Sequence, residues 1–322
     1  GVLEELAVHG TGPRHPARLF RAAGDGNRVP NSSFECGPAG WGSESAAYIT
    51  WGTPMDRLFG EVVEDGAFDG RRCLKISLGA GSWPVVNFDC YEPIRTPVKA
   101  PLAGNLGYLE LTPGEPYMLS AYLRADEEGT PARLGIRPFG QWLKSNKVQV
   151  GREWKRYTFP FTAGTNACYV LVGPDMTDAS RAACTLWVDA IQLEPGPAAR
   201  DYAPRRAVEI GLRTARPGNI FFDGEKPAVI LSMANAGKES ATAKVELKVT
   251  DLWDQPVGTE GLVLTLAGGR SMEKTVDLGL GKKGFFKVRA LVDGQELPFS
   301  LRLAVISKYS GKDSVFGINH AY

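Results

Sequence analysis

Apolar and polar residues alternate with period two along most of this chain, in short runs separated by Gly, Pro, Asn and Asp. Such alternation predicts half-buried β-strands, and no segment has the apolar stripe and end caps of a helix. The clearest runs of the first half are residues 47–51, 73–78, 85–88, 117–125, 133–139, 154–161, 168–172 and 186–193. Many short strands joined by turns predict a sandwich or a barrel.

A second set of alternating runs follows a stretch rich in Pro, Ala and Arg at residues 194–206. That composition predicts a boundary between two domains, which the chain length also favours. The runs are residues 208–212, 228–234, 243–250, 261–266, 271–276, 284–292 and 299–305. About seven strands in roughly 100 residues is the count of an immunoglobulin-like sandwich.

Two segments that enclose the first half carry a recognisable motif. Residues 31–41 read N-x-x-F-E-x-G-x-x-x-W, and residues 187–196 read W-V-D-x-I-Q-L-E-x-G. Together they resemble the first and last strands of a jelly-roll carbohydrate-binding module, of the superfamily that contains families four, nine, sixteen and twenty-two. The resemblance covers residues 30–203 and implies an all-β chain, a jelly-roll sandwich followed by an immunoglobulin-like one.

The remaining segments extend this resemblance to a larger protein. Residues 204–309 resemble the immunoglobulin-like sandwich that precedes the catalytic barrel in many multi-modular glycoside hydrolases. The F-G-x-N of residues 316–319 looks like the first strand of such a barrel, although residues 310–322 can equally be a plain tail. The resemblance implies that a catalytic domain follows and that this chain itself is non-catalytic. Residues 1–29 form an arm without an assigned role.

The charge balance narrows the class of partner. Lys and Arg number 37 against 36 Asp and Glu, a net charge of +1, which disfavours nucleic acid and an electrostatic membrane anchor. No apolar stretch is long enough to span a membrane, so we expect no membrane insertion. A neutral polysaccharide or oligosaccharide is the expected partner. The resemblance implies an extracellular or cell-surface protein whose signal peptide is absent from this chain.

All five cysteines lie in the first half, at positions 36, 73, 90, 168 and 184. Their number is odd, and no C-x-x-C pair suggests a zinc site. Several open an apolar run, where a thiol behaves as a small buried hydrophobe. Buried free thiols and a single disulfide both remain open.

Asp189 is the first candidate for metal binding, because a carboxylate in the middle of a strand needs a partner. The resemblance implies a structural Ca²⁺ held by the backbone oxygens of Ser33 and Gly70 and by the side chain and backbone oxygen of Asp189, with Glu35 as a further contributor. Hard oxygen ligands suit Ca²⁺. The alternative is that Asp189 accepts hydrogen bonds from backbone amides or pairs with an arginine such as Arg71.

Strand parity suggests a sugar site on the sheet that does not carry Asp189. If Leu134, Ile136, Val170 and Val172 face the core, the alternate residues of those strands face outward. Outward aromatic rings between amide and guanidinium groups suit a pyranose, which has an apolar C–H face and a rim of hydroxyls. The candidate sugar ligands are Trp83, Asn87, Arg137, Phe139, Gln141, Trp142 and Tyr169.

The chain shows no recognisable catalytic motif. Its histidines are His9, His15 and His320, at the two ends, and G-x-S-x-G, H-E-x-x-H and a phosphate-binding loop do not occur. We therefore expect a non-catalytic binding module with a spacer domain. Two alternatives remain: a structural or adhesive cell-surface protein without sugar binding, and a lyase built on the jelly-roll sheet.

Overall fold

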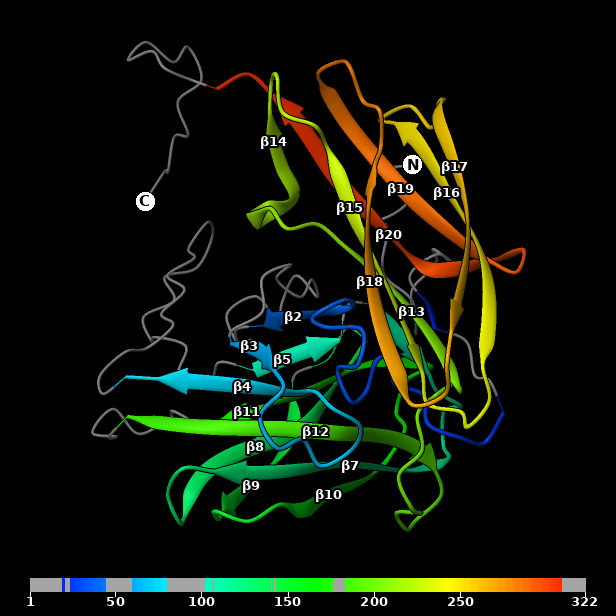
Figure 1. Cartoon of the computed structure of the whole chain (residues 1–322). Coiled ribbons are helices and arrows are strands. Elements are labelled where there is room, and N and C mark those ends of the chain that lie inside the picture. The colour runs from blue at the N-terminus through cyan, green and yellow to red at the C-terminus, as the bar shows by residue number, and fades with distance from the viewer. Residues whose placement is uncertain are drawn as a thin grey trace.

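The structure is a computed structural model that describes residues 19–20, 24–44, 60–79, 102–105, 107–139, 141, 143–175 and 183–308. Nearly all regular structure in this part is β-strand, with one short 3-10 turn, η3 (Pro217–Asn219) (Figure 1). The predicted all-β class is therefore confirmed. Among the described residues, no helix has the length and apolar character needed to cross a membrane.

The first half of the chain builds two facing sheets. Sheet A contains, in order, β1 (Leu19–Phe20), β6 (Tyr108–Glu110), β11 (Ala167–Pro174), β5 (Leu102–Asn105) and β2 (Trp41–Glu44), with β8 (Thr130–Pro138) on β11 and β9 (Lys144–Val150) on β8. Sheet B contains, in order, β10 (Lys155–Thr162), β7 (Pro116–Ala125), β12 (Cys184–Pro195), β4 (Cys73–Leu78) and β3 (Glu61–Val63). Successive strands switch repeatedly between the two sheets, as in a sandwich.

The core of this sandwich follows from the period of two. Leu134 and Ile136 of β8 and Val170 of β11 lie in one buried cluster with Leu74 and Leu123 of sheet B. The predicted parity of β8 and β11 is thus confirmed. The predicted strands at residues 47–51 and 85–88 lie outside the described residues.

The second half builds another pair of sheets with a separate core. Sheet C contains β13 (Val208–Arg213), β15 (Ala228–Asn235) and β18 (Arg270–Asp277). Sheet D contains, in order, β14 (Ile220–Phe222), β20 (Gln295–Ile306), β19 (Gly284–Val292), β16 (Ala241–Asp251) and β17 (Pro256–Leu266). Leu231 of sheet C packs with Leu247, Phe286 and Val288 of sheet D. The immunoglobulin-like assignment and the domain boundaries stay predictions.

Each predicted run of the second half overlaps one of these strands, whereas β14 was missed. Three residues are too few for a period of two to be visible. In the first half, β9 was missed because its sequence KSNKVQV is polar on both faces. It pairs only with β8 and forms an edge of sheet A, where neither face has to be apolar.

A buried asparagine ties the start of the first sandwich to its last strand. The Asn27 amide nitrogen donates to the Ser32 hydroxyl (3.2 Å), to the Ile191 carbonyl (3.0 Å) and to the Ala203 carbonyl (3.1 Å). Its amide oxygen accepts two hydrogen bonds, from the backbone N–H of Val29 (3.0 Å) and from the backbone N–H of Leu193 (3.1 Å). One side chain therefore satisfies backbone groups from three separate segments.

A second asparagine, Asn31, links the two sandwiches. Its backbone N–H donates to the Glu209 carboxylate at the start of β13 (3.0 Å), and its carbonyl accepts from the Trp41 indole N–H (2.9 Å). Nearby, Cys36 and Ala39 pack with Ala234 of β15. A Cβ on Gly211 would lie 2.5 Å from the Cβ of Ala39, so glycine is what allows this close approach.

The predicted linker at residues 194–206 is a hydrogen-bonded segment. The Ala203 N–H donates to the Gln192 side-chain oxygen (2.9 Å), and the Arg200 N–H donates to the Glu194 carboxylate (2.9 Å). The Tyr202 hydroxyl shares a 2.8 Å hydrogen bond with the Ser32 hydroxyl. Composition predicted a loose boundary because Pro, Ala and Arg are common in linkers, but these contacts fix the segment against β12.

Replacing Asn27 with Ala should lower the free energy of unfolding by about 3 kcal/mol, because several buried backbone groups would lose their partner at once. Chemical denaturation measures this effect. Limited proteolysis should then cut the variant within residues 196–206, where the wild-type chain resists.

The matched control is Asn146→Ala, since the Asn146 amide makes a single exposed bond to the Thr158 carbonyl (3.2 Å). It should change stability by less than about 0.5 kcal/mol. Equal losses in both variants would contradict the role given to Asn27.

Candidate functional site

An aromatic cluster occupies the face of sheet A that points away from the core. Arg137 of β8 lies directly opposite Tyr169 of β11 in the strand register. The Tyr108 ring of β6 stacks on Tyr169 with centroids 4.2 Å apart, and Phe139 meets Tyr108 edge-on at 5.1 Å. We call Tyr108, Arg137, Phe139 and Tyr169 the outer-face cluster.

These side chains are buried, which differs from the exposed aromatic row that parity predicted. Tyr169 and Arg137 are each 4% exposed, and Phe139 and Tyr108 are each 9% exposed. They form a cluster separate from the main core, so the predicted side of the sheet is correct while the predicted exposure is wrong. Alternation fixes the face on which a side chain lies, but it carries no information about what covers that face.

The remaining sugar candidates divide into described and undescribed residues. Gln141 is half-buried, and its backbone oxygen accepts a 3.3 Å hydrogen bond from the Arg137 guanidinium. Trp83, Asn87 and Trp142 lie outside the described residues. Tyr108 was not predicted, although Tyr-Leu-Glu has the correct alternation, because β6 is only three residues long.

A buried carboxylate pairs with two basic residues farther along the same face. Asp175 is 4% exposed and pairs with the Arg133 guanidinium (3.0 Å) and the Lys147 ammonium (3.3 Å). Arg133 and Lys147 lie opposite each other in the register of β8 and β9. Asp175 offsets one of these two positive charges, and the guanidinium and ammonium groups give the face hydrogen-bond donors.

Asp189 lies in β12 with no exposed surface, and backbone amides surround its carboxylate. One oxygen accepts from the N–H groups of Phe68 (2.8 Å) and Asp69 (3.0 Å), and the other accepts from Ala190 (2.6 Å). This is the amide-bonded alternative that the sequence left open. Ala190 has a φ of +48°, at the irregularity where β12 shifts register against β7.

Glu35 holds the same loop from its other end. Its carboxylate accepts from the backbone N–H groups of Arg71 (2.7 Å) and Arg72 (2.8 Å). In the sequence, Gly70 lies between the two residues that bond to Asp189 and the two that bond to Glu35. Its φ is +66°, and a Cβ there would lie 2.6 Å from a carboxylate oxygen of Glu35. Since Asp69 bonds to the Ser33 side chain, the predicted calcium residues do gather around residues 68–72.

The pKa of Asp189 is raised to about 8, mainly because the carboxyl is buried. The nearby Asp69 charge also raises this pKa, whereas the amide hydrogen bonds lower it. Burial also raises the pKa of the Asp69 carboxyl. A Ca²⁺ ion would favour the ionised form of both groups, so the donor chemistry fits a hard cation. The described residues contain no group of three or more His, Cys, Asp or Glu side chains placed to hold a metal. A cation here would depend on the backbone oxygens of Ser33 and Gly70.

The described cysteines are buried thiols that form no disulfide with one another, which confirms the first of the two alternatives for them. They are Cys36, Cys73, Cys168 and Cys184, and Cys90 lies outside the described residues. Burial raises the pKa of Cys73 to about 12, so its thiol is not a reactive nucleophile at neutral pH. The three histidines also lie outside the described residues.

No protein-family model matches the chain, and no curated protein matches it. Similar solved structures include carbohydrate-binding modules. A family 16 carbohydrate-binding module is 19% identical, covering 52% of this chain and 99% of its own, with a TM-score of 0.33. TmCBM61, solved with β-1,4-galactotriose, is 16% identical over 53% of this chain and 99% of its own, at a TM-score of 0.35. The N-terminal cellulose-binding domain of Cellulomonas fimi β-1,4-glucanase C is 17% identical, with coverages of 53% and 99% and a TM-score of 0.33. Similarity at this level does not establish a function for this chain.

Replacing Asp189 with Asn should flatten the pH dependence of stability. An unfolded Asp titrates near pH 4 and the folded Asp189 near 8, so between these values the folded state holds a proton that the unfolded chain releases. The stabilising contribution is complete below pH 4 and is lost as pH rises to 8. In chemical denaturation with chelator present, the free energy of unfolding of the wild type should fall between pH 4 and 8. It should fall more steeply than that of Asp189→Asn, by about 1 kcal/mol per pH unit. Parallel slopes would contradict the raised pKa.

Proposed function

We propose that this chain binds carbohydrate non-catalytically, with the outer-face cluster of sheet A as the recognition site. The observation that carries the proposal is the register pairing of Arg137 with Tyr169, beside the Tyr108 and Phe139 rings, on the face away from the core. Rings offer a flat apolar surface to the C–H groups of a sugar, and a guanidinium donates hydrogen bonds to its hydroxyls.

The burial of these rings sets a condition on binding. Because these rings are buried, a sugar contacts Phe139 or Tyr169 only in the fraction of molecules that expose them, and the apparent affinity falls in proportion to that fraction. We therefore propose a weak site. Such a site is useful when the protein is tethered near its substrate, because tethering raises the effective concentration.

In the wider context, we propose that the chain is the N-terminal part of a secreted glycoside hydrolase, with the second sandwich as a spacer. The support is the sequence resemblance of residues 30–203 and 316–319, together with the near-neutral charge. The second candidate function is a structural one. The burial of the outer-face cluster favours it, since a ring that serves only in packing needs no exposed face.

We also propose a structural Ca²⁺ beside residues 68–72, held by Asp189 and by backbone oxygens of Ser33 and Gly70, with Glu35 nearby. The support is the pair of partly or fully buried acids, Asp69 and Asp189, whose pKa values are both raised. Calcium should raise the melting temperature of the wild-type chain at pH 8, where Asp189 can ionise, and raise it less at pH 6.

Asp189→Asn is the sharper variant for this calcium test, because an amide oxygen can still accept from the loop N–H groups while the charge is removed. It should melt as a folded protein and show no response to calcium. A wild-type melting curve that is the same with calcium and with chelator would contradict the proposal.

Sugar binding is tested by affinity gel electrophoresis of the intact chain in xylan, mixed-linkage β-glucan, galactan and galactomannan. Phe139→Ala and Arg137→Gln should each weaken retardation about tenfold, from the loss of a ring contact or a charged donor worth about 1 to 2 kcal/mol.

The control is Trp154→Ala, since Trp154 immediately precedes β10 of the opposite sheet and bonds to the Gly66 carbonyl (2.9 Å). It should leave retardation unchanged. Melting curves check the fold, and Arg137→Gln decides the outcome if Phe139→Ala unfolds. Wild-type retardation in a folded Arg137→Gln variant would place any glycan site elsewhere, and no retardation of the wild type would favour the structural role.

A further inference from the structure

The most exposed aromatic rings among the described residues lie at one end of sheet D. Trp253 is 77% exposed and Phe285 is 60% exposed, whereas the rings of the outer-face cluster are at most 9% exposed. Leu252, 49% exposed, precedes Trp253 in the sequence. Ile220 and Ile306 are also exposed at this end, which is at the top of Figure 1.

The turn between β16 and β17 presents Trp253 in a fixed conformation. The Asp251 carboxylate accepts from the backbone N–H groups of Trp253 (2.9 Å) and Gln255 (3.0 Å). The Asp254 N–H donates to the Asp251 carbonyl (3.1 Å), and Asp254 has a φ of +60°. A turn held by its own side chain loses little entropy when its aromatic residue binds a ligand.

The strand register places Phe285 on the outer face of sheet D, at the end where the turn with Trp253 lies. Asp251 pairs with Phe286, so Leu252 comes opposite Phe285 at the end of the strands. Phe286 belongs to the core of the sandwich, and therefore its neighbour Phe285 faces outward. Leu252 and Phe285 thus form an apolar edge on the outer face of sheet D, and Trp253 follows Leu252 in the turn at the end of these strands.

Charged groups lie directly beside these rings. The Asp254 carboxylate bonds to the Lys287 ammonium (2.9 Å) and lies 3.5 Å from the Arg289 guanidinium, which also pairs with Glu296 (3.7 Å). Lys287 and Arg289 follow Phe285 at intervals of two along β19, so they share its face. The hydrogen bond and charge of Lys287 lower the pKa of Asp254, which is therefore ionised at neutral pH.

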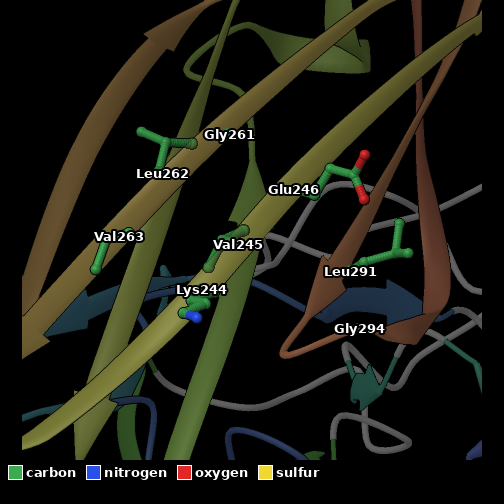
Figure 2. Close-up of a pocket in the computed structure, with 8 residues that line it drawn as sticks. All are labelled: Lys244, Val245, Glu246, Gly261, Leu262, Val263, Leu291 and Gly294. Atoms are coloured by element: carbon green, nitrogen blue, oxygen red, sulfur yellow. The ribbon is translucent and has the colours of Figure 1, made fainter.

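The same face is hollowed farther along the sheet. A shallow pocket of about 350 Å³ is lined by Glu246, Leu291, Lys244, Gly261 and Val263 among others. Figure 2 shows these side chains on the strands of sheet D. Gly261 lies opposite Glu246 in the register and has open space where a Cβ would be. Phe285 and Leu291 are six residues apart on β19, so the exposed Phe285 ring and the pocket beside Leu291 are about 20 Å apart.

We propose that the outer face of sheet D is a second carbohydrate-binding surface, which takes a neutral glycan chain lying along β19. Trp253 and Phe285 stack on the apolar faces of sugar rings, and Asp254, Lys287 and Arg289 hydrogen-bond to hydroxyls. The alternation of rings with charged groups favours a glycan over a protein partner, since the centre of a protein interface is depleted of charge. This gives the second sandwich a role beyond that of a spacer.

Affinity gel electrophoresis of the full chain in the same four polysaccharides tests this surface. Trp253→Ala and Phe285→Ala should each weaken retardation about tenfold in the polysaccharide that retards the wild type. Ile220→Ala is the matched control, because it removes an exposed apolar side chain from the same end of the sheet without removing a ring. It should leave retardation unchanged.

The outcomes separate this surface from the site on sheet A. Retardation that survives Trp253→Ala but not Arg137→Gln overturns the present proposal and leaves the proposed function standing. Retardation that survives Arg137→Gln but not Trp253→Ala supports the surface on sheet D and overturns the site on sheet A. If no polysaccharide retards the wild-type chain, both proposals are wrong. Sedimentation velocity supplies a further check: if wild-type oligomers dissociate in both Trp253→Ala and Ile220→Ala, the patch is a protein interface and the proposal is wrong.

Discussion

Two buried asparagines, Asn27 and Asn31, hold the segment before β2 where it crosses β12 and meets the second sandwich. The rest of the structure depends on this crossing. Asn27 bonds the segment before β2 to β12 and to residue 203, and Asn31 bonds that segment to its own turn, with its backbone reaching Glu209 of the second sandwich. Backbone groups buried at such a crossing must find partners, because each one left without a hydrogen bond costs about 1 to 3 kcal/mol. The amide side chain can donate and accept at once, which makes asparagine well suited to both positions.

The crossing gives the two sandwiches a shared polar junction while their cores remain separate. Hydrophobic packing fixes each pair of sheets, and hydrogen bonds and the close approach at Gly211 join the pairs. The outer faces that remain are chemically different. Sheet A has a guanidinium among buried rings, and sheet D has exposed rings among paired charges. Carbohydrate recognition can use either arrangement, but only the second is open to solvent in the conformation described.

Periodicity predicted the longer strands that bury one face, and it failed for short strands and for strands at sheet edges. The runs that became β4, β12 and β19 alternate because one side packs in a core, whereas β9 and β14 lie at sheet edges and alternate weakly or not at all. The predicted side of Arg137 and Tyr169 was correct, yet their burial depends on what covers the sheet. The partners of Asp189 are backbone amides, which leave no trace in residue types. Trp253 was missed because a residue in a turn has no periodicity.

We propose that this chain binds glycan and performs no chemistry on it. The most direct measurement is to incubate the intact chain with each soluble polysaccharide, and to assay binding by affinity electrophoresis and bond cleavage by release of reducing ends in the same samples. We expect at least one neutral polysaccharide to retard the chain. We expect the release of reducing ends in the same samples to stay at the level of a protein-free control. Release of reducing ends or unsaturated products by the purified chain, or the absence of retardation in every polysaccharide, would contradict the proposal.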